Sequence, residues 1–416
     1  MTRSLNGSVA ISVIIATFNR AESLQKCLGA LFRQTLPAEE FEVVVVDDGS
    51  IDDSFTIATN SVAPCALKVI RQEHSGIGTA RNRGVHAADG EFCLFIDDDI
   101  VAQPQLLGEH LRIQRAHGGV LGQGHLSNEF PPNADSFVRF FWRGWDDMSR
   151  DLARDPSSLT FIDSYSGNLS VPRAAFLDAG GFAIDLVCGL DVELVYRLTR
   201  QGLRLLYIPG ASAVQRYQKG RKAVISDIKI RGIGELQMYR KHPAMLPHLR
   251  LSKFDEMSFN VILLRRVLLA VHAPPLPLTA VWTALNVIGK PRWARLWYGF
   301  LMSYCYWYGL QQSKVDRDTW LRLTRAPLVL AYHAFGQEGE RASRFVVPAS
   351  RFSSQVHWLH KRGHPILGLN ELLQCRDEYR LPPARAVVIT ADDGYLDNWT
   401  IAFPILRQTG FTATFF

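Results

Sequence analysis

The amino-acid sequence predicts an α/β protein built on a mostly parallel sheet, and three observations carry that prediction. Over the first hundred residues, short apolar or β-branched runs alternate with helix-like stretches of about ten residues. The runs are apolar on successive residues, as expected for strands covered on both faces. Most of them also end directly in polar residues, and in such sheets ligands bind beyond the carboxyl ends of the strands.

The elements follow in order along the chain. Strands are predicted at 11–16, 42–46, 67–71 and 91–96, with helices at 21–31, 52–59 and 78–88 between them. A second half of the same domain is predicted from a strand near 161–170, a helix near 191–201 and a strand at 204–208. From 217 to about 312 the chain becomes basic, aromatic and helical, and a new β-like run begins at Ala326.

Length and composition are those of an ordinary globular protein. The 416 residues are 47% hydrophobic and 21% charged, which excludes disordered, collagen-like and coiled-coil chains. The length predicts two or three domains. We find no apolar stretch of spanning length and expect no signal peptide. Six scattered cysteines without a C-x-x-C pair predict reduced thiols and a cytoplasmic protein.

The positive charge is concentrated in one segment. Residues 217–325 contain 18 Lys and Arg against 6 Asp and Glu, a local net charge of +12, whereas the whole chain carries +6. The same segment holds five of the nine tryptophans: Trp282, Trp293, Trp297, Trp307 and Trp320. Its helices either pack on the rest of the protein or face an anionic membrane surface. No nucleic-acid-binding motif accompanies the charge, so we expect no nucleic-acid partner.

Two groups of carboxylates are predicted to meet at one edge of the sheet. Asp97 and Asp99 follow one strand two residues apart, and Asp47 and Asp48 end another. An isolated acidic turn is more often simply solvated, but two acidic clusters on one edge repel unless a cation lies between them. Oxygen ligands of this kind suit Mg²⁺ or Mn²⁺, which commonly bridge carboxylates to substrate phosphates.

A dinucleotide-binding fold is the first alternative, because an acid at the end of a second strand can bind a ribose. That fold requires G-x-G-x-x-G after the first strand, where this chain has ATFNR. The nearest match, Gly76-Ile77-Gly78, follows the third strand and has Arg81 in place of the last glycine. We therefore reject a dinucleotide oxidoreductase.

Ordered motifs give a specific resemblance. The chain contains SVIIATFNR, VVVVDDGSIDD, HSGIGTARNRG and FIDDDI, followed by SGNLSVPRAAFLDAGGF, GLDVELVYRL and YIPGASAVQ. Over residues 10–215 it resembles family 2 glycosyltransferases with the GT-A fold. The resemblance implies inverting transfer of a sugar from a nucleotide-sugar donor to a glycan or lipid-linked acceptor, in polysaccharide or cell-envelope biosynthesis.

The resemblance also implies roles for individual residues. Donor-binding positions are Thr17, Asn19, Arg20, Asp47, Asp48, Arg81 and Asp98. Asp97 and Asp99 match the D-x-D that holds a metal ion on the diphosphate. Asp191 matches the catalytic base, and its place at the start of a helix favours the ionised carboxylate. A helix cap is the alternative role for this aspartate.

Two positions depart from the family pattern. Leu190 stands where the family usually has an acid, and Gln215 stands where a histidine often completes the metal site. Gln215 still offers a carbonyl oxygen, so we keep it as a candidate third ligand beside Asp97 and Asp99.

The last segment resembles the opening of a polysaccharide deacetylase (β/α)-barrel domain. It contains LVLAYH, FSSQVHWLHKRGHPI, VVITADDGYLDN and FTATFF. The family pattern makes Asp392 the base and Asp393 a metal ligand, with Ala391 where a phenylalanine is usual. The family's metal-binding histidines fall after Phe416 in this pattern, so the site is incomplete and we expect no deacetylase activity from this chain alone.

The sequence thus predicts three segments: a glycosyltransferase domain at 10–215, a basic aromatic helical region at 216–325, and a partial deacetylase domain at 326–416. We expect a cytoplasmic enzyme, peripheral on the inner face of a membrane. A metal-dependent nucleotidyltransferase remains open, because it also needs paired aspartates and a metal ion. A degenerate module that binds nucleotide-sugars without turnover also remains open, given Leu190 and Gln215.

Overall fold

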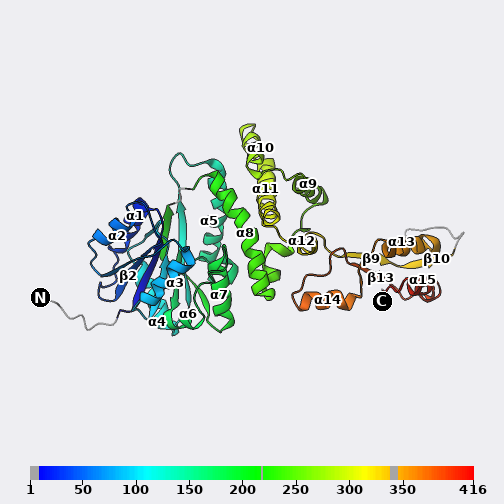
Figure 1. The fold of residues 1–416 in the computed structure, drawn as a ribbon, viewed down its shortest axis with the longest axis horizontal. Coiled ribbons are helices and arrows are strands. Elements are labelled where there is room, and N and C mark those ends of the chain that lie inside the picture. The colour runs from blue at the N-terminus through cyan, green and yellow to red at the C-terminus, as the bar shows by residue number, and fades with distance from the viewer. Residues whose placement is uncertain (1–8, 217–218, 338–344) are drawn as a thin grey trace. The chain divides into compact units, whose positions relative to one another are not determined.

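The computed structural model describes residues 9–216, 219–337 and 345–416 and divides the chain into two compact units, Met1–Asp227 and Ile228–Phe416 (Figure 1). The predicted segments 216–325 and 326–416 each include a few residues outside this described part. All six cysteines lie within it, and none of them forms a disulfide there. Cys65 and Cys188 are partly exposed, and the other four are buried.

The first unit is built around an eight-stranded sheet. Its elements are β1 (Ile11–Thr17), α1 (Ala21–Leu31), β2 (Phe41–Asp47), α2 (Ser54–Asn60), β3 (Ala66–Arg71), α3 (Ile77–Ala87), β4 (Phe92–Ile96), β5 (Ile100–Ala102), α4 (Leu106–His117), β6 (Leu121–Glu129), α5 (Ser136–Arg154), the short turns η1 (Pro156–Ser158) and η2 (Phe161–Asp163), β7 (Asn168–Pro172), α6 (Arg173–Asp178), α7 (Leu190–Arg200), β8 (Leu205–Arg216) and the start of α8 (Arg221–Lys241). The strand order is β3-β2-β1-β4-β7-β6-β8-β5. Strands β3, β2, β1 and β4 are parallel, and β7 runs antiparallel to β4. The prediction of an α/β fold is confirmed.

Helices cover both faces of this sheet because its central strands are apolar on successive residues. One face packs Ile11, Val13 and Ile15 of β1 against α1 and α4. The other face packs Ile14 of β1 and Phe95 of β4 against α3, α6 and α7. Every residue of β2 and β4 is buried. This three-layer arrangement fixes the strand ends at which the polar residues lie.

Two details differ from the sequence prediction. Strand β3 is partly exposed along its length, because it forms the edge of the sheet rather than its centre. The strand predicted near 161–170 is confined to β7, and Phe161–Asp163 forms a single turn instead. The reason is local: Asp163 accepts hydrogen bonds from both the backbone N–H and the hydroxyl of Thr160, which closes a capping box.

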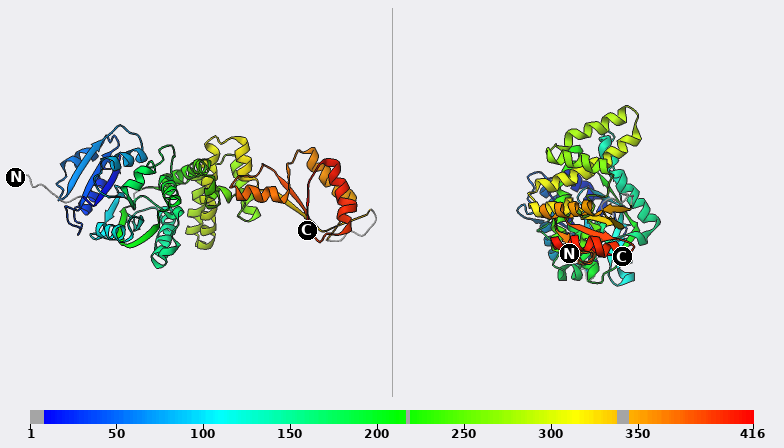
Figure 2. Two further views of the ribbon diagram at one scale, coloured as in Figure 1. Left: turned by 90° about the horizontal axis from the view of Figure 1, so that it is seen from below. Right: turned by 90° about the vertical axis from the view of Figure 1, so that its right-hand side faces the viewer.

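The second unit begins with helices and ends with a small α/β segment (Figures 1 and 2). Its elements are the rest of α8, η3 (Pro243–His248), η4 (Arg250–Ser252), α9 (Phe259–Ala270), α10 (Pro275–Val287), α11 (Pro291–Gln312), α12 (Arg317–Thr324), β9 (Leu328–Tyr332), β10 (Ala334–Gly336), β11 (Val346–Pro348), α13 (Ala349–Lys361), β12 (Ile366–Leu367), α14 (Leu369–Asp377), β13 (Val387–Ala391), η5 (Asn398–Ala402), α15 (Phe403–Thr409) and β14 (Thr414–Phe415). No helix in the described ranges combines the length and apolar character needed to cross a membrane.

The helices of the second unit pack closely around α11. A β-carbon at Gly309 would lie 2.3 Å from the carbonyl oxygen of Lys229, so only glycine permits α11 and α8 to approach this closely. The hydroxyl of Tyr306 on α11 donates to the buried carboxylate of Glu235 on α8 at 2.8 Å. Arg265 of α9, fully buried, donates to Ser303 of α11 at 2.7 Å. These contacts fix α8, α9 and α11 as one packed group.

The C-terminal segment has a parallel sheet in which β13 pairs with β9 on one side and with β12 and β14 on the other. Phe352, Val356 and Leu406 of α13 and α15 pack on β13 through one apolar cluster. Figure 2 shows these strands and helices in orange and red. A parallel α/β sheet agrees with the predicted class of this segment, but the described residues form an open sheet rather than a closed barrel.

Candidate active site

Polar residues meet at the carboxyl ends of three parallel strands in the first unit's sheet. Thr17 at the end of β1 pairs in register with Asp47 at the end of β2, and Asp97 follows β4 directly. Beside them lies a cavity of about 440 Å³. It is lined by Ala16, Thr17, Phe18, Arg20, Asp48, His74, Ile77, Asp97, Asp98, Asp99, Trp142, Gln215, Lys219 and Asp227. The predicted gathering of side chains at this edge is therefore present for Thr17, Arg20, Asp48 and the three aspartates after β4.

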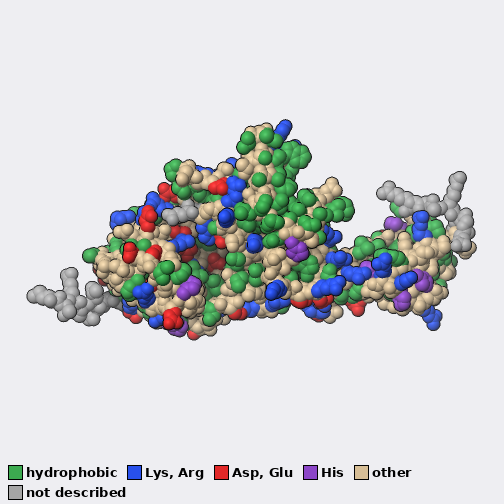
Figure 3. All heavy atoms as spheres, turned by 45° about the horizontal axis from the view of Figure 1, so that its top comes forward, with side chains coloured by type: hydrophobic (Ala, Val, Ile, Leu, Met, Phe, Trp, Pro, Cys, Tyr) green, Lys and Arg blue, Asp and Glu red, His purple; other side chains and the backbone are tan. Residues whose placement is uncertain are grey.

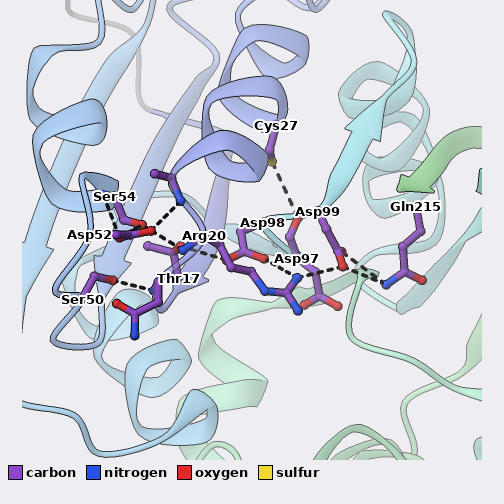
Figure 4. A network of polar contacts seen from close by, with 12 residues as sticks. Thr17, Arg20, Cys27, Ser50, Asp52, Ser54, Asp97, Asp98, Asp99 and Gln215 are labelled. Carbon is purple, nitrogen blue, oxygen red and sulfur yellow. Dashed lines mark hydrogen bonds and ion pairs between the residues drawn. The ribbon is translucent and has the colours of Figure 1, made fainter. Parts of the chain in front are cut away.

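Each of these three aspartates has a different partner. Asp97 accepts a short hydrogen bond from Arg81, whose side chain is buried on α3. Asp98 accepts from the hydroxyl of Thr17 at 2.8 Å (Figure 4). Asp99 accepts from the amide nitrogen of Gln215 at 3.2 Å. These hydrogen bonds connect the three carboxylates, in this order, to α3, β1 and β8.

Arg20, directly before α1, reaches across two of these carboxylates. Its Nη1 lies 3.2 Å from Oδ1 of Asp98 and 2.9 Å from Oδ2 of Asp99. Figure 4 shows the guanidinium among the aspartate side chains. In this arrangement Arg20 supplies the positive charge that the acidic cluster requires.

Burial raises the pKa values of two of these aspartates. Burial raises the pKa of Asp98 to about 7, against the opposing effects of Arg20 and Thr17. Burial and the nearby charge of Asp97 also raise the pKa of Asp99. A bound cation would favour the ionised forms, and carboxylate oxygens are ligands that Mg²⁺ and Mn²⁺ accept.

The residues fit a divalent ion incompletely. Among the residues that the structure describes, no group of three or more His, Cys, Asp or Glu side chains is arranged to hold a metal. Gln215 faces Asp99 with its amide nitrogen rather than its oxygen. Asp97 and Asp99 therefore supply two oxygen-bearing groups, and further ligands would come from the phosphates or from water.

The two acids at the end of β2 differ in their roles. Asp47 is fully buried and accepts from the Ser50 backbone N–H, while its Oδ2 lies 3.3 Å from Nε of Arg71. Asp48 lines the cavity and accepts from the backbone N–H groups of Ser75 and Gly76, both at 2.9 Å. Asp48 thus holds the loop that leads into α3 against the end of β2.

Asn19 shapes the turn after β1. Its backbone adopts a left-handed conformation with φ 53°, which asparagine tolerates better than most residues. Its side-chain oxygen accepts from the backbone N–H of Ile51 at 2.8 Å. Asn19 also borders a second hollow of about 420 Å³, which is lined in part by three cations: Arg20, Arg216 and Lys219.

Asp191 lies in the first turn of α7 and is positioned by the segment before β7. Its Oδ2 accepts from the backbone N–H of Ser166 at 3.2 Å and lies 3.5 Å from the Ser166 hydroxyl. A β-carbon at the next residue, Gly167, would lie 3.1 Å from Oδ2 of Asp97. The Ser166–Gly167 backbone thus runs beside both carboxylates, although Asp191 does not itself line the cavity described above.

Sequence reasoning missed several residues of this site. Phe18 and His74 stack with ring centroids 4.1 Å apart, and both line the cavity. Trp142 of α5 and Lys219 also line it. Phe18 and His74 stand inside the quoted motifs, where a signal existed. Trp142 lies in a long amphipathic helix that was not predicted, and no local pattern marks it.

In the second unit, the predicted acids after β13 lie near the residue that follows β9. His333 Nδ1 is 3.5 Å from Oδ2 of Asp393 and 3.9 Å from Oδ2 of Asp392. Asp393 is exposed, and His333 and Asp392 are partly exposed. The parallel pairing of β9 with β13 brings these residues together, because it places both strand ends at one edge.

Comparisons with known proteins address the first unit most directly. Residues 12–167 match the model of the family described as Glycosyl transferase family 2. Validoxylamine A glucosyltransferase of Streptomyces hygroscopicus subsp. jinggangensis is 31% identical over 271 residues, which cover 58% of this chain and 62% of that relative. The chain thus spans less than two thirds of the length of this relative.

One solved structure and one further relative extend the comparison. A mannosyltransferase from Pyrobaculum calidifontis, PcManGT, solved with GDP-Man and Mn²⁺, superposes with a TM-score of 0.51 at 19% identity, over 76% of this chain and 89% of that one. That likeness concerns the fold, which is a mixed α/β, GT-A-like arrangement with an open sheet. YxkH of Bacillus subtilis (strain 168), provisionally named a polysaccharide deacetylase, is 31% identical over 110 residues, which cover 26% of this chain and 38% of that protein.

The family match covers β1 to the residue before β7, and so includes Thr17, Asp47, Arg81 and the three aspartates after β4. It begins and ends inside the first unit. Over residues 12–167 the first unit is therefore similar to the glycosyltransferases of family 2.

Proposed function

We propose that the chain is an inverting glycosyltransferase that moves a sugar from a nucleotide-sugar donor to a glycan or lipid-linked acceptor in cell-envelope polysaccharide biosynthesis. The observation that carries the proposal is the position of Asp191. The Ser166–Gly167 backbone runs beside both Asp191 and Asp97. A base and an acidic cluster of this kind are the two parts that an inverting displacement needs. A cytoplasmic location, at the inner face of a membrane, belongs to the same proposal.

The donor would bind along the edge formed by β1, β2 and β4. Thr17, Asp47, Asp48 and Arg81 are proposed to hold the nucleoside end, either directly or by fixing the loops around it. The second hollow beside Asp99 is lined by the cations Arg20, Arg216 and Lys219 and by the acids Glu22 and Asp52. Its three cations are proposed to receive the diphosphate. Asp97 and Asp99 would hold a Mg²⁺ or Mn²⁺ ion, which stabilises negative charge on a leaving diphosphate.

In the reaction, the acceptor hydroxyl gives its proton to a carboxylate oxygen of Asp191. The acceptor oxygen forms a bond to the anomeric carbon as the bond from that carbon to the diphosphate oxygen breaks. The electron pair of the breaking bond leaves with the nucleoside diphosphate. The Ser166 N–H group orients Asp191, and the N-terminus of α7 favours its ionised form. Attack opposite the leaving group inverts the anomeric configuration.

The test has a binding stage and a product stage. Thermal unfolding of the chain would be measured with UDP, GDP and their sugars, each with and without Mn²⁺, and the stabilising donor would then be incubated with an acceptor panel. Release of nucleoside diphosphate together with a glycosylated product supports the proposal. Release of pyrophosphate would instead identify a nucleotidyltransferase. Donor binding without turnover on any acceptor would favour a degenerate binding module.

A second module is proposed for residues 326–416, which we relate to polysaccharide deacetylases. The specific observation is that His333 lies within 4 Å of the carboxylates of Asp392 and Asp393 at neighbouring strand ends. We expect glycosyl transfer to be the only activity of this chain. Acetate release from an acetylated oligosaccharide should therefore be absent. Release that disappears in Asp392→Asn would contradict that expectation and give the chain a second activity.

A further inference from the structure

We propose that α9, α10 and the turn between α10 and α11 form a docking surface for an anionic lipid bilayer. We call this surface the apolar face. It consists of Phe259, Leu263, Val267 and Val271 at α9, Val281, Val287 and Ile288 at α10, and Trp293 and Leu296 at α11. The proposal deepens the membrane location proposed above by naming the surface that attaches, and it does not depend on the transferase reaction.

The first line of evidence is the stripe along α9. Phe259, Leu263, Val267 and Val271 recur every four residues and so lie on one side of the helix. Their exposed fractions are 76%, 50%, 51% and 67%. A helix that borders only water normally presents polar side chains on this side. The stripe is therefore typical of a helix with an apolar neighbour.

Helix α10 continues the pattern without any charge. None of its thirteen residues is Asp, Glu, Lys or Arg, and its exposed side chains are apolar except for that of Asn286. At its end, Val287 is 81% exposed and Ile288 is 63% exposed. Trp293 and Leu296, in the first turns of α11, are 63% and 60% exposed. Figure 3 shows hydrophobic side chains gathered over these helices.

Charge identifies the partner. The sequence contains no acidic residue between Glu256 and Asp316, a stretch that includes all of α9, α10 and α11. Lys290, Arg292 and Arg295 are exposed beside the apolar end of α10. Apolar side chains surrounded by cations suit an interface with acyl chains and anionic headgroups.

Two tryptophans of this segment do not lie on the apolar face. Trp282 is only 3% exposed, and Trp297 donates its indole N–H to the carbonyl of Leu278 at 3.0 Å. Both rings therefore join α10 to α11 instead of facing outward, and Trp293 is the ring that lies on the apolar face. Because the two helices are already packed together, attachment requires little rearrangement of the protein.

Geometry favours attachment in the plane of the interface. Thirteen helical residues extend about 20 Å, which is less than the roughly 30 Å of a bilayer core. A second copy of the chain is a poorer occupant, because two such faces would bring like charges together with no acid of the segment to pair with them. A nucleic acid would leave the apolar stripe unused.

The experiment is flotation of the full chain with vesicles of phosphatidylcholine alone or with 30% phosphatidylglycerol, at low and high salt. At low salt we expect at least tenfold stronger binding to the anionic vesicles than to the neutral ones. High salt should release only part of the protein, because salt screens the charges but not the apolar contacts. Val287→Glu with Ile288→Glu should weaken this binding at least tenfold. The matched control is Val62→Glu, which alters a 93% exposed valine of the first unit and should change nothing.

A second variant tests the charge separately. Each basic residue near an anionic surface is worth about 1 kcal/mol, or roughly fivefold in affinity, so Lys290→Gln, Arg292→Gln and Arg295→Gln together should lower binding at least tenfold. Arg351→Gln, Lys361→Gln and Arg362→Gln, also exposed, remove the same charge from α13 and the residue after it and should have much less effect. Circular dichroism and the thermal midpoint check that each variant is folded.

Three results would overturn the proposal. The first is equal binding to neutral and anionic vesicles, or no binding to either. The second is an equal loss of binding in the α10 variant and its Val62 control. The third is a dimer in sedimentation velocity without lipid that Val287→Glu dissociates, because the apolar face would then join two copies of the chain. None of these results depends on transferase activity, so failure here is distinguishable from failure of the proposed reaction.

Discussion

Nη1 of Arg20 lies 2.9 Å from Oδ2 of Asp99, so the arginine bonds to one of the two carboxylates assigned to a metal ion. The same nitrogen lies 3.2 Å from Asp98, and the Arg20 side chain is 38% exposed. An arginine so placed has two consequences for the donor. It must release Asp99 when an ion binds there, and it is then available to a phosphate.

Arg20→Gln should therefore change two affinities in opposite directions. Without nucleotide, Mn²⁺ should bind severalfold more tightly, because a partly exposed ion pair worth up to about 1 kcal/mol no longer competes for Asp99. With Mn²⁺ present, the nucleoside diphosphate should bind more weakly, because a phosphate partner is lost. Calorimetry with Mn²⁺ alone and with UDP or GDP measures both. Parallel changes in the two affinities would contradict this account.

Asp99→Asn should weaken the Mn²⁺-dependent part of nucleotide binding by about tenfold or more, because one anionic oxygen ligand is replaced by a neutral amide. The measurement is the nucleotide affinity with and without Mn²⁺. Asp178→Asn is a suitable control, since that aspartate is exposed at the end of α6 in the same unit. Unchanged binding in Mn²⁺, with full turnover, would remove Asp99 from the metal site.

Asp191→Asn should leave nucleotide affinity within about twofold of the parent and lower transfer by roughly 10²–10⁴-fold, the usual value of a general base. The amide still accepts from Ser166, so α7 should begin at the same place. Single-turnover rates and donor affinity separate the two effects. A decrease of only a few-fold in a folded variant would return Asp191 to the role of a helix cap.

His110 should make the first unit less stable in mild acid. Burial lowers its pKa to about 4, and its ring bonds Asn168 and Ser170 in the neutral form. A histidine in an unfolded chain titrates near 6.5, so between these values only the unfolded state takes up the proton. The stabilisation that neutral His110 provides is complete above about pH 6.5 and is lost as the pH falls towards 4. Between pH 7.5 and 5 it lowers the free energy of unfolding by about 2 kcal/mol.

The test compares urea midpoints at pH 7.5 and 5. His110→Gln keeps a donor for Asn168 but cannot be protonated, so the shift between the two pH values should shrink. His117→Gln changes an exposed histidine of the same helix and should keep the parent's pH dependence. An equal shift in the parent and the His110 variant would mean that other groups cause the acid sensitivity.

The sequence predicted the cluster at the strand ends because parallel strands place their carboxyl ends at one edge. No knowledge of side-chain packing was needed to predict that Thr17, Asp48 and the three aspartates after β4 lie close together. The contact from Ser166 to Asp191 could not be predicted, because it joins residues from separate elements through a backbone N–H. No periodicity in the sequence carries that information.

Exposure was the other limit of sequence analysis. Trp282 and Trp293 belong to the same basic, aromatic segment, and nothing in the sequence says which of the two rings is buried. One is 3% exposed and the other 63%, because α11 covers one side of α10 and leaves the turn between them open. Hydrophobic character can be read from a sequence, but which neighbour covers a residue depends on tertiary packing.

The distribution of thiols has a practical consequence for studying this protein. Four of the six cysteines are buried, and burial raises the pKa of Cys65 to about 11, which keeps it protonated near neutral pH. Cys188 is partly exposed and stands three residues before Asp191. A maleimide dye should therefore attach first at Cys188. The unmutated chain would then carry one fluorescent reporter beside its proposed base, with which donor and acceptor binding can be followed in real time.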